Sequence, residues 1–258
     1  MYNYDDNSLA AHLFRIKESN GNPAVIAKEW NEIKKKPREI FLLMERAIND
    51  LYDCGENGAR WFAMLLSHVF KTEISDEEFK KGIMKDVAAS GEPEKKLEMF
   101  RDGILMALVA RVMDGSANLD TKKFYGIVAR ELVYATEDCK HSLRIKAWFS
   151  DLIGNLIRPA AYTDNHRVAY AILMDVDSTF VSKRVLQLLA KKCNSPEPGI
   201  SEGAKNALAA LIANTPEKEK KGRVWAAICK ALENESEEKR KQTKREISER
   251  SVKLKRIF

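Results

Sequence analysis

Apolar residues recur along the chain at spacings of three and four, and turn-forming residues interrupt them roughly every 20 positions. Such spacings place side chains on one face of an α-helix. The interruptions, such as SNGNP, DCGENG and NSPEPG, are rich in glycine, proline and asparagine. The pattern predicts helices over residues 6–18, 23–35, 38–53, 57–71, 76–89, 93–113, 120–136, 139–157, 164–175, 179–193, 201–214, 217–233 and 237–256.

No segment alternates apolar and polar residues with a period of two, so the sequence predicts an all-α fold without strands. Ser75 with Glu78 forms an expected capping box at one helix start, and Asp120 is an expected N-cap at another. Residues 61–70 (WFAMLLSHVF) and 104–113 (ILMALVARVM) are apolar on nearly all sides. We expect these two helices to be packed on more than one side.

Pairs of predicted helices recur roughly every 40 residues. This spacing resembles that of HEAT and armadillo repeats, in which antiparallel helical hairpins stack into a right-handed superhelix. No internal sequence similarity accompanies the spacing, and an irregular multihelical bundle has nearly the same pattern. Both architectures therefore stay open at this point.

The composition is that of an ordered chain, with 258 residues, 45% hydrophobic and 32% charged. Such a chain buries a substantial core without disulfides or metal ions. The four cysteines lie far apart in the sequence and form no zinc or redox motif. No signal-peptide pattern is present, and the longest apolar runs are far shorter than a membrane span. We expect a cytoplasmic or nuclear protein.

Charge is distributed unevenly along the chain. Residues 239–258 carry nine Lys or Arg and two Glu, a net of +7. Residues 1–238 carry 35 basic and 36 acidic side chains, a net of −1. The high isoelectric point is therefore a property of the last twenty residues.

This imbalance predicts an all-helical body over residues 1–236, with a possible hinge at 193–203, and a basic C-terminal helix or arm over 237–258. The arm also carries a thin apolar stripe that includes Ile247, Leu254 and Phe258. Three roles stay open for it: packing on the body as a terminal cap, docking into a partner protein, or gripping nucleic acid or an anionic membrane.

One segment has catalytic spacing. Asp175, Asp177 and Thr179 in AILMDVDSTF resemble the D-x-D-x-T motif of haloacid dehalogenase-type phosphatases, in which the first aspartate is the nucleophile and the second the general acid. That family needs the motif after a parallel strand, and no strand is predicted here. We therefore interpret the segment as the end of one helix and the cap of the next.

Other chemistry-bearing patterns are incomplete. Residues 114–125 resemble a calcium loop, but Leu119 and Tyr125 replace the glycine and the bidentate acid that such a loop requires. The histidines are dispersed, and no glycine-rich phosphate loop or nucleophile elbow occurs. The sequence predicts no enzymatic activity, no cofactor and no metal site.

The sequence therefore predicts a non-enzymatic helical adaptor or scaffold that binds a protein partner. The alternative is an RNA- or DNA-binding helical protein that uses the basic arm and several basic helix ridges. The candidate residues for partner or nucleic-acid binding are Lys34, Lys35, Lys36, Arg38, Lys140, Arg144, Lys183, Arg184, Lys239, Arg240, Lys241, Lys244, Arg245, Leu254 and Phe258.

Overall fold

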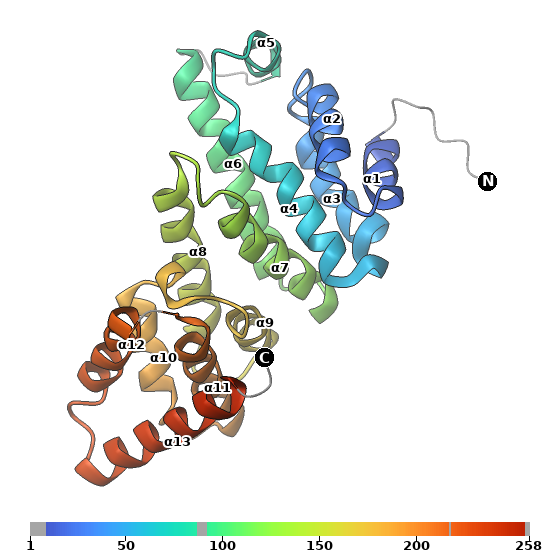
Figure 1. The fold of residues 1–258 in the computed structure, drawn as a ribbon. Coiled ribbons are helices and arrows are strands. Elements are labelled where there is room, and N and C mark those ends of the chain that lie inside the picture. Colours follow the sequence, from blue (N-terminus) through green and yellow to red (C-terminus); the bar gives the residue numbers. More distant parts are fainter. Residues whose placement is uncertain (1–8, 87–91, 217, 256–258) are drawn as a thin grey trace. The chain divides into compact units, whose positions relative to one another are not determined.

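The structure is a computed structural model, and it describes residues 9–86, 92–216 and 218–255. Every regular element in these ranges is a helix, and no strand occurs there (Figure 1). The predicted all-α class is confirmed, and each predicted range overlaps one α-helix. Within the described ranges, no helix combines the length and the apolar character needed to cross a membrane.

The chain forms two compact units, Met1–Ser142 and Leu143–Phe258. The proposed hinge at 193–203 and the basic segment 237–258 both fall inside the second unit. The helices of the first unit are α1 (Leu9–Glu18), α2 (Pro23–Ile33), α3 (Glu39–Leu51), α4 (Gly55–Lys71), α5 (Glu77–Asp86), α6 (Pro93–Met113) and α7 (Leu119–Ala135), with the short helix η1 (Tyr52–Cys54) before α4.

Helices of the first unit stack in alternation, with α5 standing outside the series. Thus α1 packs on α3, α2 on α4 and α4 on α7. The rings of Phe41 in α3 and Phe100 in α6 meet edge to face, with centroids 5.4 Å apart. Stacked helices run parallel: Trp30, near the end of α2, donates to Thr72, just after α4, at 3.0 Å. Parallel stacking of alternate helices is the arrangement that repeated helical hairpins produce.

A buried arginine joins α6 to the end of α4. Only 1% of Arg101 is exposed, and its guanidinium donates to the carbonyls of Val69 (3.2 Å), Phe70 (3.5 Å) and Thr72 (2.8 Å), and to Glu98 (2.6 Å). Carbonyls at a helix C-terminus have no partner within the helix. Arg101 therefore satisfies the end of α4 and fixes the position of α6.

The second unit repeats the alternation. Its helices are α8 (Ser142–Ile157, which begins at the unit boundary), α9 (Asp164–Leu173), α10 (Lys183–Lys192), α11 (Pro198–Asn214), α12 (Lys218–Ala231) and α13 (Glu237–Lys255), with η2 (Ser178–Phe180) before α10. Here α9 packs on α11, α10 on α12 and α11 on α13. In Figure 1 α13 is the long red helix beside α11.

Helices α8 and α10 also run parallel. The backbone N–H of Ser182, at the start of α10, donates to Ser150 in α8 at 2.9 Å. At the other end, the Lys192 ammonium donates to the carbonyls of Arg158 (3.3 Å) and Pro159 (2.6 Å), just beyond α8. The two helices therefore lie side by side along most of α10.

The basic helix α13 packs against the second unit, which is the first of the three roles left open for it. Its inward face places Thr243, Ile247 and Ser251 in buried positions, and Ile247 is fully buried. Ion pairs join its flanks to α11: Lys205 lies 2.7 Å from Glu246, and Arg250 lies 2.6 Å from Glu202. The described part of the basic segment is therefore a packed helix.

The turn between α1 and α2 depends on one glycine. Gly21 has a backbone φ of +66°, and a Cβ atom there would lie 2.0 Å from the Trp61 ring. L-residues rarely adopt positive φ, and the ring blocks any side chain. The Trp61 ring therefore closes over the turn because residue 21 has no side chain.

Two predicted caps are wrong by one or two residues. Asp76, rather than Ser75, accepts a first-turn backbone N–H of α5 at 3.0 Å. Asn118, rather than Asp120, does so for α7 at 2.8 Å. Asp120 instead lies in the first turn, where its charge interacts favourably with the helix dipole.

The phosphatase-like segment forms a helix junction. The helix α9 ends at Leu173, and Asp177 accepts the backbone N–H of Thr179 at 2.6 Å, which caps η2. This geometry confirms the interpretation of the segment as a helix end followed by a cap.

Candidate functional site

The most exposed large apolar side chains of the first unit, within its described residues, lie on α6. Met99 is 55% exposed and Met106 is 64% exposed. They are seven residues apart, which places them on one face of the helix. The expectation that the helix over 104–113 is packed on more than one side is met, since α6 contacts both α5 and α7, while the side that carries Met106 is open.

The neighbouring helix α3 also carries an exposed apolar side chain. Leu42 is 48% exposed, and it lies three residues before Glu45 on the same side of α3. The Glu45 carboxylate pairs with Arg111 of α6 at 3.0 Å, so this side of α3 borders α6. We name Leu42, Met99 and Met106 the apolar row.

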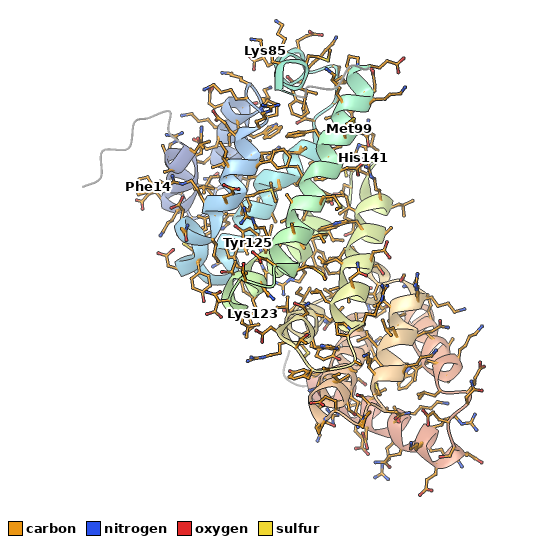
Figure 2. The ribbon with its side chains drawn as sticks, turned by 180° about the vertical axis from the view of Figure 1, so that it is seen from behind. Phe14, Lys85, Met99, Lys123, Tyr125 and His141 are labelled. Carbon is orange, nitrogen blue, oxygen red and sulfur yellow. The ribbon has the colours of Figure 1, made fainter. Side chains whose placement is uncertain are left out.

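The apolar row stands on a tightly packed base. A Cβ atom at Gly103 of α6 would lie 3.2 Å from the Phe41 ring, so the glycine lets α3 approach α6 closely. Arg101, on the opposite side of α6, is fixed by backbone carbonyls of α4. A rigid base matters for binding because less ordering entropy is lost when a partner docks. In Figure 2, Met99 is labelled on α6 and Phe14, 48% exposed, on α1.

The predicted basic cluster at 34–38 is largely neutralised. Lys34 lies 2.6 Å from Asp76, Lys35 lies 2.9 Å from Glu32, and Lys36 lies 3.4 Å from Glu39. Burial opposes the ionisation of Asp76, but hydrogen bonds from Lys34 and from the backbone lower its pKa overall. Of this group, Arg38 alone forms no ion pair within the described part of the chain.

The ridge predicted at 140–146 is divided by the unit boundary. In the first unit Lys140 lies 2.5 Å from Glu73, and this hydrogen bond lowers the pKa of the Glu73 carboxyl. In the second unit Arg144 is half-buried in the first turn of α8. The two residues therefore belong to separately described parts of the molecule.

The basic positions of α13 are mostly paired with glutamates one helical turn away. Such pairs join Lys239 to Glu235 (3.7 Å), Lys241 to Glu237 (2.7 Å) and Arg245 to Glu249 (2.7 Å). The remaining candidates on this helix are Arg240, Lys244 and Leu254, which are half-buried, and Phe258, which lies outside the described residues. The net charge of the segment is therefore spread along a helix that carries its own counter-charges.

Lys183 and Arg184 differ from the other predicted cations. Both are exposed in the first turn of α10, and neither forms an ion pair with any residue that the structure describes. They are the part of the predicted basic surface that remains available.

Buried polar groups elsewhere are structural. In the first unit Glu29 accepts hydrogen bonds from Arg15 (2.7 and 2.8 Å) and lies 2.6 Å from the His12 ring nitrogen. Burial opposes the charge of Glu29, but these bonds lower its pKa. The described residues contain no group of three acidic, cysteine or histidine side chains that could hold a metal ion.

Two of the cysteines mark the extremes of exposure. Cys229 is exposed on α12, whereas Cys193 is buried just after α10, where its thiol lies 3.5 Å from the carbonyl of Leu189. Burial raises the pKa of the Cys193 thiol to about 12.

The sequence contains a signal for two residues of the apolar row, but the surrounding residues indicate a buried helix. Met99, Met106 and Met113 stand at strict seven-residue spacing. The residues around Met106 are so apolar that this part of the segment indicates a buried helix. Methionine at repeated spacing is also typical of adaptable binding surfaces, and that was the signal that distinguished this face.

Comparisons with known proteins give little further guidance. No family model matches the chain, and no curated protein matches it. Among solved structures, the chain is similar to a designed armadillo repeat protein in complex with the peptide (KR)4. That match has 15% identity, covers 95% of this chain and 100% of the other, and has a TM-score of 0.38. At this score the match carries no argument, and the helical architecture rests on the contacts described above.

Proposed function

We propose that the chain is a non-enzymatic helical adaptor whose first unit binds a protein partner through the apolar row. The observation that supports this most directly is the exposure of Met99 and Met106 on one face of a helix whose other face is core. Exposed apolar surface of this kind is unfavourable in water and typical of interaction sites.

The chemistry of the surface indicates the kind of partner. Methionine side chains are flexible and polarisable, so they adapt to apolar groups of different shapes. Met99 and Met106 are separated by about 10 Å along the helix axis. Apolar side chains repeating at two-turn spacing on a partner helix match this separation. The Glu45–Arg111 ion pair beside the row supplies a polar rim.

Nucleic-acid binding by the basic ridges has less support. Most of the predicted cations, including Lys34, Lys140 and Arg245, have a carboxylate within 4 Å. A phosphate backbone would have to compete with these carboxylates for each cation. The adaptor is therefore the function that we favour.

Site-specific photo-crosslinking tests the proposal. A photoreactive side chain is placed at position 106 of the full chain and, as a control, at position 84, where Met84 of α5 is also exposed. A partner that uses the apolar row is captured from position 106 and not from position 84. The captured protein is then purified, and its Kd is measured by calorimetry.

Matched variants decide the outcome. We expect the double variant Met99→Glu, Met106→Glu to raise the Kd for the purified partner by about tenfold or more. A carboxylate cannot be buried against apolar groups without a large cost in free energy. The control Met84→Glu keeps the original Kd. An unchanged Kd in the double variant would contradict the proposal, provided that circular dichroism shows the variant folded.

A further inference from the structure

The parallel packing of α8 and α10 leaves a cavity of about 260 Å³ inside the second unit. Its floor is apolar, formed by Gly154, Val185 and Leu188. A Cβ atom at Gly154 would lie 3.4 Å from a methyl group of Val185, an ordinary contact distance, so these two residues are neighbours where the helices meet. The cavity opens to solvent at a rim of charged side chains.

The rim is strongly basic. Arg158, Arg184 and Lys191 line the cavity together with one carboxylate, Asp151. None of these four side chains forms an ion pair or a hydrogen bond with any residue that the structure describes. Three cations against one carboxylate leave two positive charges at the opening of a small pocket.

This arrangement differs from ordinary helix capping. At the ends of α8 and α10, the ammonium of Lys192 donates hydrogen bonds to the carbonyls of Arg158 and Pro159. The capping role is therefore already filled by Lys192, while the neighbouring Lys191 lines the cavity. It also differs from α13, where Arg245 and Arg250 each hold a glutamate.

We propose that this cavity binds a phosphate monoester. A monoester carries nearly two negative charges at neutral pH, which balances the two excess positive charges of the rim. Arginine guanidinium groups bind phosphate oxygens in bidentate fashion, and lysine adds a third point of attachment. The apolar floor accommodates the carbon group to which the phosphate is attached.

The size of the cavity sets which monoesters fit best. Its volume is below the range of about 300–1,000 Å³ in which whole drug-sized ligands are enclosed. A single phosphorylated side chain or a small aryl phosphate fits this space, whereas the base and ribose of a nucleotide would extend outside it. The site is independent of the apolar row, because it lies in the other unit.

Calorimetric titration of the full chain at pH 7.5 and low salt tests the site. The probes are phenyl phosphate, AMP, inorganic phosphate and methyl phenyl phosphate, a diester with one negative charge. We expect phenyl phosphate to bind at least five times more tightly than the diester. Binding of either phenyl phosphate or AMP supports a monoester site. Tighter binding of phenyl phosphate indicates a phosphorylated side chain as the ligand, and tighter binding of AMP indicates a nucleotide. Failure of every probe to bind at 5 mM would overturn the proposal.

Charge-matched variants separate the cavity from general electrostatic attraction. The test variant is Arg158→Gln, Lys191→Gln. The control, Lys183→Gln, Lys230→Gln, also removes two exposed cations from the second unit but leaves the cavity lining intact. We expect at least tenfold weaker phenyl phosphate binding in the test variant and less than twofold change in the control. Equal losses in both variants would overturn the proposal, since they would indicate attraction to net charge alone.

Discussion

The two long helices α6 and α13 have opposite relations to solvent. Helix α6 contains one of the two segments predicted to be apolar on nearly all sides, yet it exposes Met99 and Met106 and buries Arg101. Helix α13 comes from the most basic stretch, yet it is anchored by a buried Ile247 and its charges are largely paired. The comparison teaches that composition identifies an unusual segment, whereas the partners of its side chains decide whether the segment is available for binding.

The largest effect is expected from removing the buried cation of α6. The variant Arg101→Ala leaves the carbonyls of Val69 and Thr72 without a donor in the core. We expect a loss of about 3–5 kcal/mol in the free energy of unfolding, measured by urea denaturation. The matched control is Arg245→Ala in α13, whose side chain is exposed beside Glu249, with an expected loss below about 1 kcal/mol. Similar losses in the free energy of unfolding in both variants would contradict the view that the arginine of α6 is structural and the arginine of α13 is not.

A smaller effect is expected from removing the apolar anchor of α13. Ile247→Ala creates a cavity between α13 and α11, and substitutions of this kind cost about 2–5 kcal/mol in a core. We expect α13 to become sensitive to protease in the native protein, as measured by limited proteolysis and mass spectrometry. Val252→Ala is the control on the same helix, because Val252 is 48% exposed. If α13 resists protease equally well in the Ile247→Ala variant and in the control, then α13 does not depend on this anchor.

The smallest effect is expected from acid. Hydrogen bonds from Lys205 and Arg250 lower the pKa of Glu246 and of Glu202, respectively, below the ordinary 4.5. Because the pKa values are lower in the folded state, these pairs stabilise α13 at pH above 4.5, and their contribution is lost as the pH falls below it. The glutamates are partly exposed, so we expect a loss of roughly 0.5–1 kcal/mol.

Hydrogen exchange resolves this acid effect by helix. Protection factors of α13 amides are compared between pH 6 and pH 3.5, with α6 as the internal reference. The bonds from Arg101 to carbonyl groups do not titrate in this range, so α6 should lose less protection than α13. A larger loss in α6 would contradict the assignment of titrating contacts to α13.

Much of the fold was predictable because helix formation leaves a local signal. Spacings of three and four and the turn segments located every helix, since both depend on residues close in sequence. The caps were less certain: Asp76 and Ser75 are adjacent and have similar capping chemistry, so a shift of one residue is invisible in the sequence.

The binding surfaces were harder to predict because they depend on contacts between helices. The sequence shows that Lys34 carries a positive charge, but only the packing of α2 near α5 shows that Asp76 lies beside it and neutralises it. Arg158 lies just beyond α8 and Lys191 lies near the end of α10, and only the parallel packing of these two helices brings them to one cavity. Met106 is exposed because the helices that pack on α6 leave its side of the helix open, which the composition of α6 does not encode.

Because Cys193 is buried, opening of the second unit can be detected by labelling of its thiol. Its thiol is protonated at neutral pH, since burial raises the pKa to about 12, and no reagent reaches it while α10 and α11 stay packed. Cys229, exposed on α12, reacts at once with the same reagent. After a timed pulse of a thiol-specific label, peptides of the second unit therefore carry one label, at Cys229, while the unit stays closed, and a second, at Cys193, after it has opened.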